Sequence, residues 1–482
     1  MKLRPLYVVV LLCCAVMISA FLGTNKIDKR LRLVADTAVG FKIDTLVTNV
    51  IVPWQITFLP DGSMLFTERA GRVRIYRDKK LLPKPALTVS DIALDKKTGL
   101  LGMCLHPAFA QNRWIYIASN YTDNNRIRVR VARYEYRNDS LISPFTIIKD
   151  IPGNQNHTGC RLIFGPDKKL YITTGDADQP ILAQDLKALN GKILRMNDDG
   201  TIPADNPFAK NDTARKEVWS YGHRNPQGLA FEPGTGVLFD SEHGPTGGDE
   251  INIIKPGQNY GWPIIHHQDT REGMISPLLE YTPSIGPSEA VFYNGNAFPE
   301  LKGNLLVACL RGESILRITL NNDKPISQEV LLKKQYGRIR SLVTGPDGYL
   351  YISTSHYDPP EGKGEPPYDM ILRLRPSNEK IKQRVQRIAI NKKSAAQKQT
   401  AAVMFQQLCA ACHGDHLQGT EKTKSLLGRN FSHGGSKEAI INNITNGIIA
   451  KGMPSWRGAI SEKDIAKIAD YVWVTSKRKP SK

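Results

Sequence analysis

The sequence predicts an all-β six-bladed β-propeller followed by a small all-α domain. A tight turn of the Pro-Asp-Gly kind, followed by residues that alternate between apolar and polar, recurs along residues 50 to 375. After Pro376 the composition becomes basic and polar, and the last residues carry helical apolar spacing instead. Short alternating strands between tight turns are typical of antiparallel sheet, whereas apolar residues three and four apart are typical of helices.

The first residues have the pattern of an export signal. Lys2 and Arg4 precede an uncharged apolar run from Leu6 to Leu22, which matches the charged and apolar regions of a secretory signal peptide. Ser19-Ala20 offers an imperfect cleavage point, and an uncleaved segment would stay as an anchor. We therefore expect residues 1–23 to be a signal peptide or N-terminal anchor and the protein to be periplasmic.

The chain is strongly basic, with 65 lysines and arginines against 46 aspartates and glutamates and a net charge of +19. No aromatic-interleaved basic stripe or nucleic-acid motif accompanies this charge, which favours a solvated surface over nucleic-acid binding. Such a surface could steer an acidic electron-transfer partner or meet a lipid surface. Two of the seven cysteines lie in the export segment, and the odd number left argues against a disulfide framework.

The repeated turn predicts the propeller. It occurs as FLPDGSMLFTERAG, FGPDKKLYITTGD, FEPGTGVLFDSEHG and TGPDGYLYISTS, and more loosely as LHPAFAQNRWIYIASN and FPELKGNLLVACLRG. Six copies over about 325 residues give roughly 55 residues each, the size of a four-stranded blade. Alternation predicts strands that are half buried and half exposed. We expect the clusters at the strand ends, Glu68-Arg69, Gly175-Asp176 and Glu242-His243, to converge near the central channel.

One stretch, Trp219 to Pro263, gathers polar residues around a predicted hairpin from Leu229 to Ser241. Ahead of the hairpin, His223-Arg224-Asn225-Pro226 places a cation, an amide and a rigid turn together, which suits binding of carboxylates or quinone oxygens. Behind it, Gly244-Pro245 and Gly247-Gly248-Asp249-Glu250 offer carbonyls and carboxylates, which are ligands for hard cations. The alternative interpretation is a surface ion pair beside ordinary glycine turns.

Four segments of the predicted propeller carry a resemblance to a known family: SYGHRNPQGLAF, GPTGGDEINIIKPGQNYGWP, NHTGCRLIFGPDKKLYITTGD and YGRIRSLVTGPDGYLYI. They resemble the soluble quinoprotein sugar dehydrogenases of the glucose and sorbosone dehydrogenase kind. The resemblance covers residues 42–376. It implies a six-bladed propeller that holds pyrroloquinoline quinone (PQQ) and calcium and oxidises a sugar.

The resemblance assigns roles residue by residue. His157 takes the place of the catalytic base, and imidazole suits this role because an alcohol loses its hydroxyl proton while hydride leaves the same carbon. Arg224 and Asn225 match the pair that contacts the quinone, where a cation stabilises negative charge. The remaining implied cofactor contacts are three arginines, which can bind carboxylates bidentately, and one hydroxyl: Arg311, Arg338, Arg340 and Ser284.

The resemblance also implies two calcium positions. The backbone carbonyls of Gly244 and Pro245 match those that bind the cofactor-linked ion, which acts on the quinone as a Lewis acid. Glu250 and Tyr260 match a second calcium position.

Two positions depart from the glucose-oxidising members. Lys97-Thr98 stands where those members have Gln-Asn, and Arg311 stands where they have lysine. An amide both donates and accepts hydrogen bonds, whereas an ammonium only donates and adds a charge. We therefore expect a substrate other than free glucose, such as an acidic sugar or a sugar aldehyde. The alternative is that Lys97 points into solvent.

Beyond the propeller, residues 377–396 are expected to form a basic linker, because six basic residues and one acidic residue occur between Ser377 and Lys393. The run Cys409-Ala410-Ala411-Cys412-His413 then matches the attachment motif of c-type haem. Its two thiols would form thioethers to the haem, and its histidine would be the proximal iron ligand.

The second axial ligand of the haem iron is expected to be Met453, on the turn Gly452-Met453-Pro454. A zinc site would instead need two more ligands, and only His416 and His433 are on offer. A closing helix is predicted from Ser461 to Thr475. Residues 397–477 resemble a small class I cytochrome c throughout.

The two halves together predict a periplasmic quinohaemoprotein dehydrogenase. It would oxidise a sugar or related alcohol or aldehyde with PQQ and pass electrons to haem c and then to a respiratory acceptor, such as a cytochrome or an oxidase. The fusion makes the first transfer intramolecular. Two alternatives remain: a calcium-dependent propeller lactonase or other hydrolase, and a carbohydrate-binding propeller whose cytochrome serves another enzyme. No nucleic-acid partner is expected, and membrane contact only through an uncleaved N-terminal segment.

Overall fold

The structure is a computed structural model. It describes residues 39–245, 247–356, 368–377, 400–414, 416–420, 423–429, 431–448, 451, 453, 456 and 462–477. The predicted export segment, residues 1–23, and nearly all of the predicted linker lie outside the described residues. Within the described ranges, no helix combines the length and apolarity that a membrane crossing requires.

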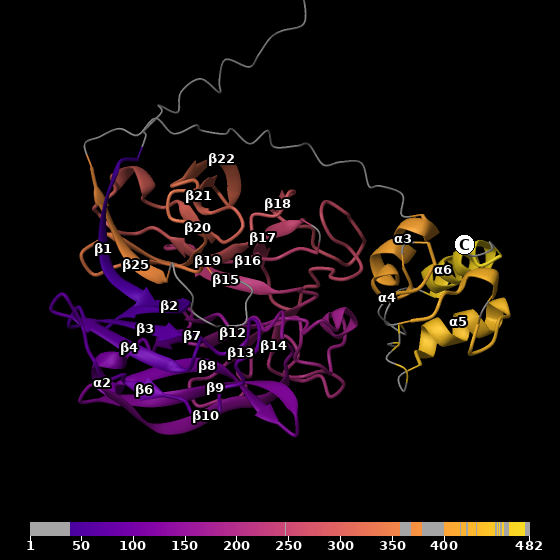
Figure 1. Ribbon diagram of the computed structural model, residues 1–482, viewed down its shortest axis with the longest axis horizontal. Helices are drawn as coiled ribbons and strands as arrows, with labels where there is room; N and C mark the ends of the chain where they lie inside the picture. Colours follow the sequence, from indigo (N-terminus) through magenta and orange to yellow (C-terminus); the bar gives the residue numbers. More distant parts are fainter. Residues whose placement is uncertain are drawn as a thin grey trace, which may run out of the picture. The chain divides into compact units, whose positions relative to one another are not determined.

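Six antiparallel sheets form the propeller, as the repeat predicts (Figure 1). The first three sheets comprise β2–β6 (Pro53–Phe58, Met64–Glu68, Arg72–Arg77, Lys80–Leu81, Leu87–Thr88), β7–β10 (Leu100–Leu105, Trp114–Asp123, Arg126–Arg137, Ser140–Pro152) and β11–β14 (Leu162–Phe164, Leu170–Thr174, Lys192–Met196, Val218–Tyr221). The next three comprise β15–β18 (Pro226–Phe231, Leu238–Glu242, Asp249–Ile254, Leu279–Tyr281), β19–β22 (Pro287–Phe292, Leu305–Cys309, Ser314–Asn321, Lys324–Leu331) and β23–β25 with β1 (Ile339–Thr344, Leu350–Thr354, Asp369–Pro376, Phe41–Val50).

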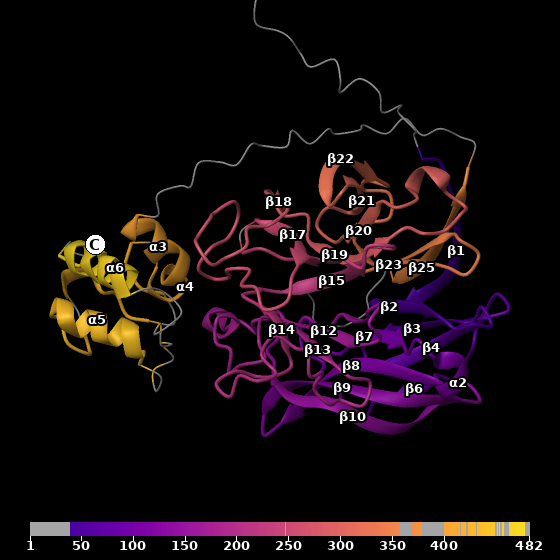
Figure 2. The same ribbon diagram turned by 180° about the vertical axis from the view of Figure 1, so that it is seen from behind.

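The six sequence repeats are the hairpins that join the first and second strand of each sheet. In the sheet of β2, the Gly62 N–H donates to Leu59 O at 2.9 Å; in the last sheet, the Gly348 N–H donates to Gly345 O at 3.0 Å. The first strands β2, β7, β15 and β19 lie toward the middle of the ring, and β10 and β22 lie at its rim (Figures 1 and 2). Short helical turns, α2 (Phe109–Asn112), η2 (Pro180–Ala183) and η3 (Pro299–Leu301), occupy connections.

The second strands depart from the predicted half-exposed alternation. Every residue of β3, β12, β16, β20 and β24 is buried. The physical reason is that each sheet of a propeller packs between two neighbouring sheets, so both faces of its second strand are covered. Polar residues at the ends of these strands are therefore held by a rigid, buried framework.

The ring of sheets is closed by pairing between a strand from the start of the propeller and a strand from its end. β1, the first described strand, pairs antiparallel with β25, the last strand of the propeller, so that Phe41 lies opposite Pro376 and Ile43 opposite Leu374. The last sheet thus combines strands from both ends of the propeller.

The C-terminal part is helical. Its elements are α3 (Ala401–Leu408), α4 (Ala410–His413), η4 (Leu427–Arg429), α5 (Lys437–Asn446) and α6 (Glu462–Thr475). The Ser436 side chain caps α5 by accepting from the Ala439 N–H at 3.1 Å. α6 packs against α3 and α5 and buries Ile465, Ile468, Ala469 and Val472, the stripe predicted for the closing helix.

Candidate active site

Side chains that follow the second strands of the sheets gather at one face of the propeller. Asp176 follows β12, His243 follows β16 and Arg311 follows β20. Equivalent strand ends of a propeller point the same way around the axis. This arrangement brings polar residues far apart in the sequence to one channel mouth.

His157 is held by a buried carboxylate. Its Nδ1 lies 2.8 Å from Asp176 Oδ1 and 3.3 Å from Asp178 Oδ1, and the side chains of His157 and Asp176 are 14% and 1% exposed. The backbone supports this pair, because the Asp178 N–H donates to the same Asp176 oxygen at 2.9 Å. A Cβ on Gly175 would stand 2.0 Å from His157 O, so this approach requires glycine. The imidazole is thus fixed in orientation, as a general base requires.

Arg224 is anchored beside this pair. Its backbone N–H donates to Glu242 Oε2 at 2.9 Å, and its side-chain Nη1 donates to His243 O at 3.3 Å. Its guanidinium lies 5.3 Å from the centre of the Trp262 ring. Burial lowers the pKa of Arg224, and its Nε is buried without a hydrogen-bond partner. An orphaned donor on a buried cation suits an anionic ligand.

Asn225 has its amide orientation set by the protein. Its Oδ1 accepts from the Gly159 N–H at 3.2 Å and from Gln227 Nε2 at 3.0 Å. The carbonyl side of the amide is therefore engaged in the protein, which leaves the NH2 group for a ligand oxygen. Gln227, which the sequence analysis did not single out, also accepts from Arg340 Nη1 at 3.0 Å and so joins two predicted cofactor residues.

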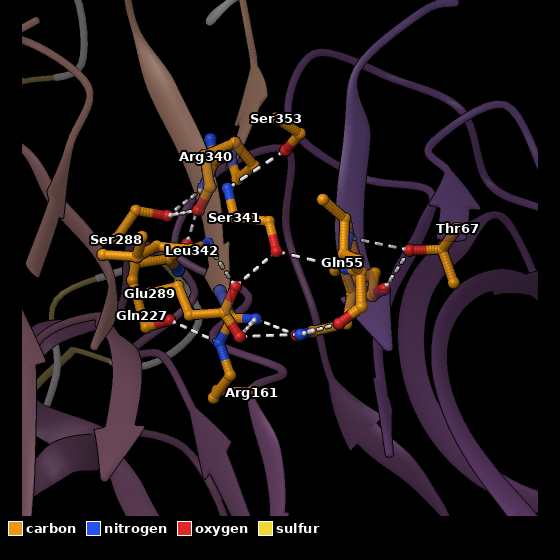
Figure 3. Close-up of polar contacts among 12 residues, drawn as sticks. Gln55, Thr67, Arg161, Gln227, Ser288, Glu289, Arg340, Ser341, Leu342 and Ser353 are labelled. Carbon is orange, nitrogen blue, oxygen red and sulfur yellow. Dashed lines mark hydrogen bonds and ion pairs between the residues drawn. The ribbon is translucent and has the colours of Figure 1, made fainter. Parts of the chain in front are cut away.

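A buried polar network surrounds Glu289 between the inner strands (Figure 3). Its carboxylate accepts from Gln55 Nε2 at 2.6 Å and from the Leu342 N–H at 2.8 Å, lies 3.2 Å from Arg161 Nη1, and also accepts from the Ser341 hydroxyl. These residues come from or adjoin β2, β11, β19 and β23. The Glu289 carboxylate is thus held from several sides, whereas Arg161 Nη2 is buried without a hydrogen-bond partner.

Arg340 belongs to this network. It is 6% exposed, and its guanidinium lies 5.6 Å from the centre of the Trp54 ring, while that of Arg161 lies 4.3 Å away. Arg338 is half-buried and Arg311 is exposed. The three predicted cofactor arginines therefore differ in setting, and only Arg340 is built into the interior.

The predicted calcium loop is tied together by Asp249. Asp249 Oδ1 accepts from the Gly244 N–H at 2.9 Å, and Oδ2 accepts from the Ser284 hydroxyl and the Gly286 N–H, both at 2.7 Å. A Cβ on Gly244 would stand 2.1 and 2.2 Å from the carbonyl oxygens of Gly247 and Gly248. The loop thus requires glycine and gathers backbone oxygens, which fits a hard cation. The Ser284 hydroxyl hydrogen is already committed to Asp249.

A second cluster of acidic groups lies around Asp240. Both of its carboxylate oxygens are buried without hydrogen-bond partners, and so is Asn252 Oδ1. Burial and neighbouring carboxylates, including Glu242, raise the pKa values of Asp240 and Glu250 well above their ordinary values. Such orphaned oxygens and crowded negative charge fit a bound cation.

Histidine and tyrosine rings border the Asp240 cluster. His223 Nδ1 lies 3.1 Å from Glu242 Oε1 and 3.7 Å from Asp240 Oδ2, and the Tyr260 ring stacks on His223 with centroids 4.8 Å apart. The Tyr260 hydroxyl donates to Ile253 O at 2.6 Å. Of the predicted pair, Glu250 belongs to the acidic cluster, and Tyr260 borders it through His223.

The loop of Lys97 adjoins the loop of His157. The Lys97 N–H donates to Gln155 O at 3.2 Å, two residues before His157, and Gln155 Nε2 donates to Asp95 Oδ2 at 2.5 Å. The Lys97 side chain is half-buried.

The haem motif lies on the turn from α3 into α4. The His413 N–H donates to Cys409 O at 3.0 Å, and both motif cysteines are free thiols. Burial raises the pKa of Cys409 to about 12 and lowers that of His413, whose Nδ1 is buried without a partner. Met453 pairs through its backbone with Ile448. The flanking Gly452 and Pro454 lie outside the described residues. The turn that carries Cys409, Cys412 and His413 thus holds two free thiols and a neutral imidazole, which fits covalent haem attachment.

The fold and these groups define a class: a six-bladed propeller with polar groups gathered at one face, continued by a helical domain of the cytochrome c type. Residues 50–361 match the family Glucose / Sorbosone dehydrogenase, and residues 396–472 match the family Cytochrome C oxidase, cbb3-type, subunit III. The chain belongs to the Glucose / Sorbosone dehydrogenase family, and its C-terminal part is a cytochrome c domain.

Relatives support this assignment. The chain is 36% identical to the aldose sugar dehydrogenase YliI of Escherichia coli strain K12 over 355 residues, 70% of this chain and 93% of the relative. It is 29% identical to the quinoprotein glucose dehydrogenase B of Acinetobacter calcoaceticus over 411 residues, 65% of this chain and 85% of the relative. The PQQ-bound aldose sugar dehydrogenase of Streptomyces coelicolor matches with 32% identity and a TM-score of 0.62, over 70% of this chain and 98% of that one.

Proposed function

We propose that the protein is a periplasmic quinohaemoprotein dehydrogenase that oxidises a sugar or related alcohol or aldehyde with PQQ and passes the electrons to a covalently bound haem c. The observation that carries this proposal is the His157–Asp176 pair, 2.8 Å apart and adjoining the anchored Arg224, in a chain that also carries the haem attachment motif. A positioned base with a cation nearby is what proton removal and acceptance of negative charge require.

The residues gathered at this face of the propeller would have different roles in the reaction. His157 Nε2 would accept the hydroxyl proton of the substrate, because Nδ1 is engaged by Asp176. Arg224 and the NH2 group of Asn225 would bind oxygens of the cofactor, and Arg311 and Arg338 would meet its carboxylates. Arg340 would support Asn225 through Gln227. When bound, PQQ supplies the quinone that takes two electrons from the substrate.

Calcium fits the loop of Gly244 and Pro245 and the acidic cluster of Asp240 and Glu250. We propose one ion at the loop, beside the cofactor, where a cation would polarise quinone oxygens. The second ion would neutralise carboxylates that are otherwise buried together and would hold the sheet of β15–β18 in place.

The cytochrome domain makes the protein its own first electron acceptor. We propose that Cys409 and Cys412 bind the haem and that His413 and Met453 ligate its iron, with a respiratory cytochrome or oxidase accepting electrons downstream. The proposed parts of the chain are an export segment or anchor at residues 1–23, the dehydrogenase at 42–376, a linker at 377–396 and the cytochrome at 397–477.

Reconstitution tests this function. Purified protein loaded with haem is titrated with PQQ and Ca²⁺, and haem reduction is followed by absorbance after addition of aldoses, aldonic acids and sugar aldehydes. Substrate-dependent haem reduction that requires PQQ is expected. Hydrolysis of lactones without PQQ would support a hydrolase instead, and sugar binding without turnover would support a carbohydrate-binding propeller.

A further inference from the structure

The structure contains a second histidine that is oriented by a buried aspartate. His356 follows β24 in the last sheet as Asp176 follows β12 in the third sheet. The third and last sheets of a six-bladed ring lie on opposite sides of its axis. His356 therefore belongs to the same face as His157, across the channel from it.

The His356–Asp369 pair resembles the His157–Asp176 pair in geometry. His356 Nδ1 lies 2.8 Å from Asp369 Oδ1, which also accepts from the His356 N–H at 2.7 Å and from the Thr354 hydroxyl at 3.1 Å. Asp369 Oδ2 accepts from the Val52 N–H at 2.8 Å. The Asp369 side chain is 1% exposed and that of His356 is 27% exposed. This carboxylate is buried and fixed by several donors, while the imidazole it orients remains accessible.

The free ring nitrogen of His356 lies next to a predicted cofactor residue. Because Nδ1 donates to a carboxylate, Nε2 carries the lone pair, and no described residue hydrogen-bonds it. A Cβ on Gly337 would stand 3.4 Å from Nε2, and the Ser355 N–H donates to Arg338 O at 2.9 Å. Asp369 and the backbone of the segment that carries Arg338 therefore lie against this imidazole.

The proposed reaction releases two protons at different steps. Oxidation of an alcohol, CH–OH, to a carbonyl, C=O, releases two electrons and two protons, and a haem takes electrons only, one at a time. His157 accounts for the hydroxyl proton. The second hydrogen leaves the substrate as hydride, and its proton must depart from the reduced cofactor when the electrons go to the haem.

We propose that His356, positioned by Asp369, accepts this second proton through Nε2. Asp369 would stabilise the imidazolium that forms, as Asp176 does for His157. In this step a bound, reduced cofactor would lose the proton of an O–H group, which would form the His356 Nε2–H bond, and its two electrons would pass in turn to the ferric haem and onward to the external acceptor. This inference rests on the proposed function and adds a residue to it.

The test uses the variant His356→Gln, whose amide can still donate to Asp369 but cannot take up a proton. It measures reduction of the cofactor by substrate separately from reduction of the haem by the cofactor. The holoprotein with PQQ and Ca²⁺ is mixed with substrate in a stopped-flow spectrometer without oxygen, and absorbance follows cofactor reduction and haem reduction separately. We expect cofactor reduction to stay within about twofold and haem reduction to slow by about tenfold or more. In His356→Ala, whose short side chain leaves room for it, added imidazole should restore haem reduction. His157→Gln should instead abolish cofactor reduction.

A matched control is His106→Gln. His106 also pairs with a carboxylate, at 3.2 Å from Asp198, but it follows the first strand of its sheet and so lies at the opposite strand ends. The His106→Gln substitution should leave the rates of cofactor reduction and haem reduction unchanged. Unaltered haem reduction in His356→Gln, or slow haem reduction in His356→Ala that imidazole does not restore, would overturn the inference while the proposed function stands.

An independent measurement uses the cofactor-free protein. Nitrogen chemical shifts of the His356 ring, assigned by their loss in His356→Gln, should report the Nδ1–H tautomer and should change when PQQ is added. An Nε2–H tautomer, or no change with bound PQQ, contradicts the inference alone. A wild-type protein that binds no PQQ contradicts the proposed function and the inference with it.

Discussion

The indole N–H of Trp262 donates to Asp176 Oδ2 at 2.8 Å, on the carboxylate whose other oxygen meets His157. The same indole ring lies beside the guanidinium of Arg224. One side chain therefore touches both the residue that orients the base and the predicted cofactor cation. Any displacement of Trp262 would change the two together.

Trp262→Phe tests this link, since it keeps an aromatic ring for Arg224 and removes the donor to Asp176. Loss of a hydrogen bond to a charged group costs about 1.5 to 3 kcal/mol, so kcat/KM should fall by about ten- to hundredfold with PQQ affinity retained. Trp219→Phe is the control, because the indole nitrogen of Trp219 is buried without a partner. Equal effects of the two substitutions on kcat/KM would contradict the link.

His157→Ala should abolish turnover and leave PQQ binding nearly intact, because the base acts on the substrate and the arginines hold the cofactor. Turnover is measured by haem reduction and binding by fluorescence titration. A loss of activity below about tenfold would remove His157 from the mechanism.

Met453→Ala should lower the haem reduction potential and remove absorption due to sulfur ligation in the oxidised protein, while the haem stays covalently attached through Cys409 and Cys412. Potentiometric titration and visible spectroscopy measure this. An unchanged spectrum would point to His416 or His433 as the ligand.

The Asp240 cluster predicts a pH-dependent stability. The pKa values of Asp240 and Glu250 are raised, so the folded state binds their protons more tightly than the unfolded chain. Without calcium, their contribution to the free energy of unfolding should fall as pH rises from about 4, where unfolded carboxyls titrate, through the raised values. Thermal unfolding of metal-free wild type and of Asp240→Asn/Glu250→Gln should show a smaller loss in the variant.

Calcium should reverse this loss, because it binds the ionised carboxylates of the folded state. Its stabilising effect should therefore grow from about pH 5 to about pH 7 in the wild type and be small in the double variant. A calcium effect of the same size in both proteins would exclude the cluster as a binding site.

The substrate is predicted not to be free glucose, since Lys97 replaces an amide in a loop that hydrogen-bonds the loop of His157. One altered hydrogen bond changes specificity by about ten- to hundredfold. Catalytic efficiency on glucose, sorbosone and a uronic acid should be compared in wild type, Lys97→Gln and the exposed control Lys96→Gln. Glucose as the best substrate, with no effect of Lys97→Gln, would refute the prediction.

The sequence predicted the propeller because every blade repeats its signal locally: a turn such as Pro346-Asp347-Gly348 must lie between two adjacent strands. The haem motif is equally local, since covalent spacing alone brings Cys409, Cys412 and His413 onto one turn. The alternation alone indicates half-exposed strands, whereas burial of the second strands on both faces follows from the predicted propeller, in which neighbouring sheets cover each sheet.

The supporting contacts of the site could not be predicted. Trp262 and Asp176 are 86 residues apart, and Gln227 and Arg340 are 113 apart. No periodicity or spacing relates such pairs, because the circular order of the blades brings them together. The predicted role of His157 rests on resemblance. Asp176 was expected near the channel, but its pairing with His157 emerged only from the fold.

The pairing of β1 with β25 determines when the ring can close. Because Phe41 lies opposite Pro376, the first described strand of the propeller has no partner until the last strand is available to fold. Until then an unpaired strand edge remains in an incomplete ring, which is a site for wrong pairing between unfinished chains. We expect a chain that is cut before Pro376 to keep this open edge and to aggregate, whereas loss of the cytochrome domain alone would leave the ring closed.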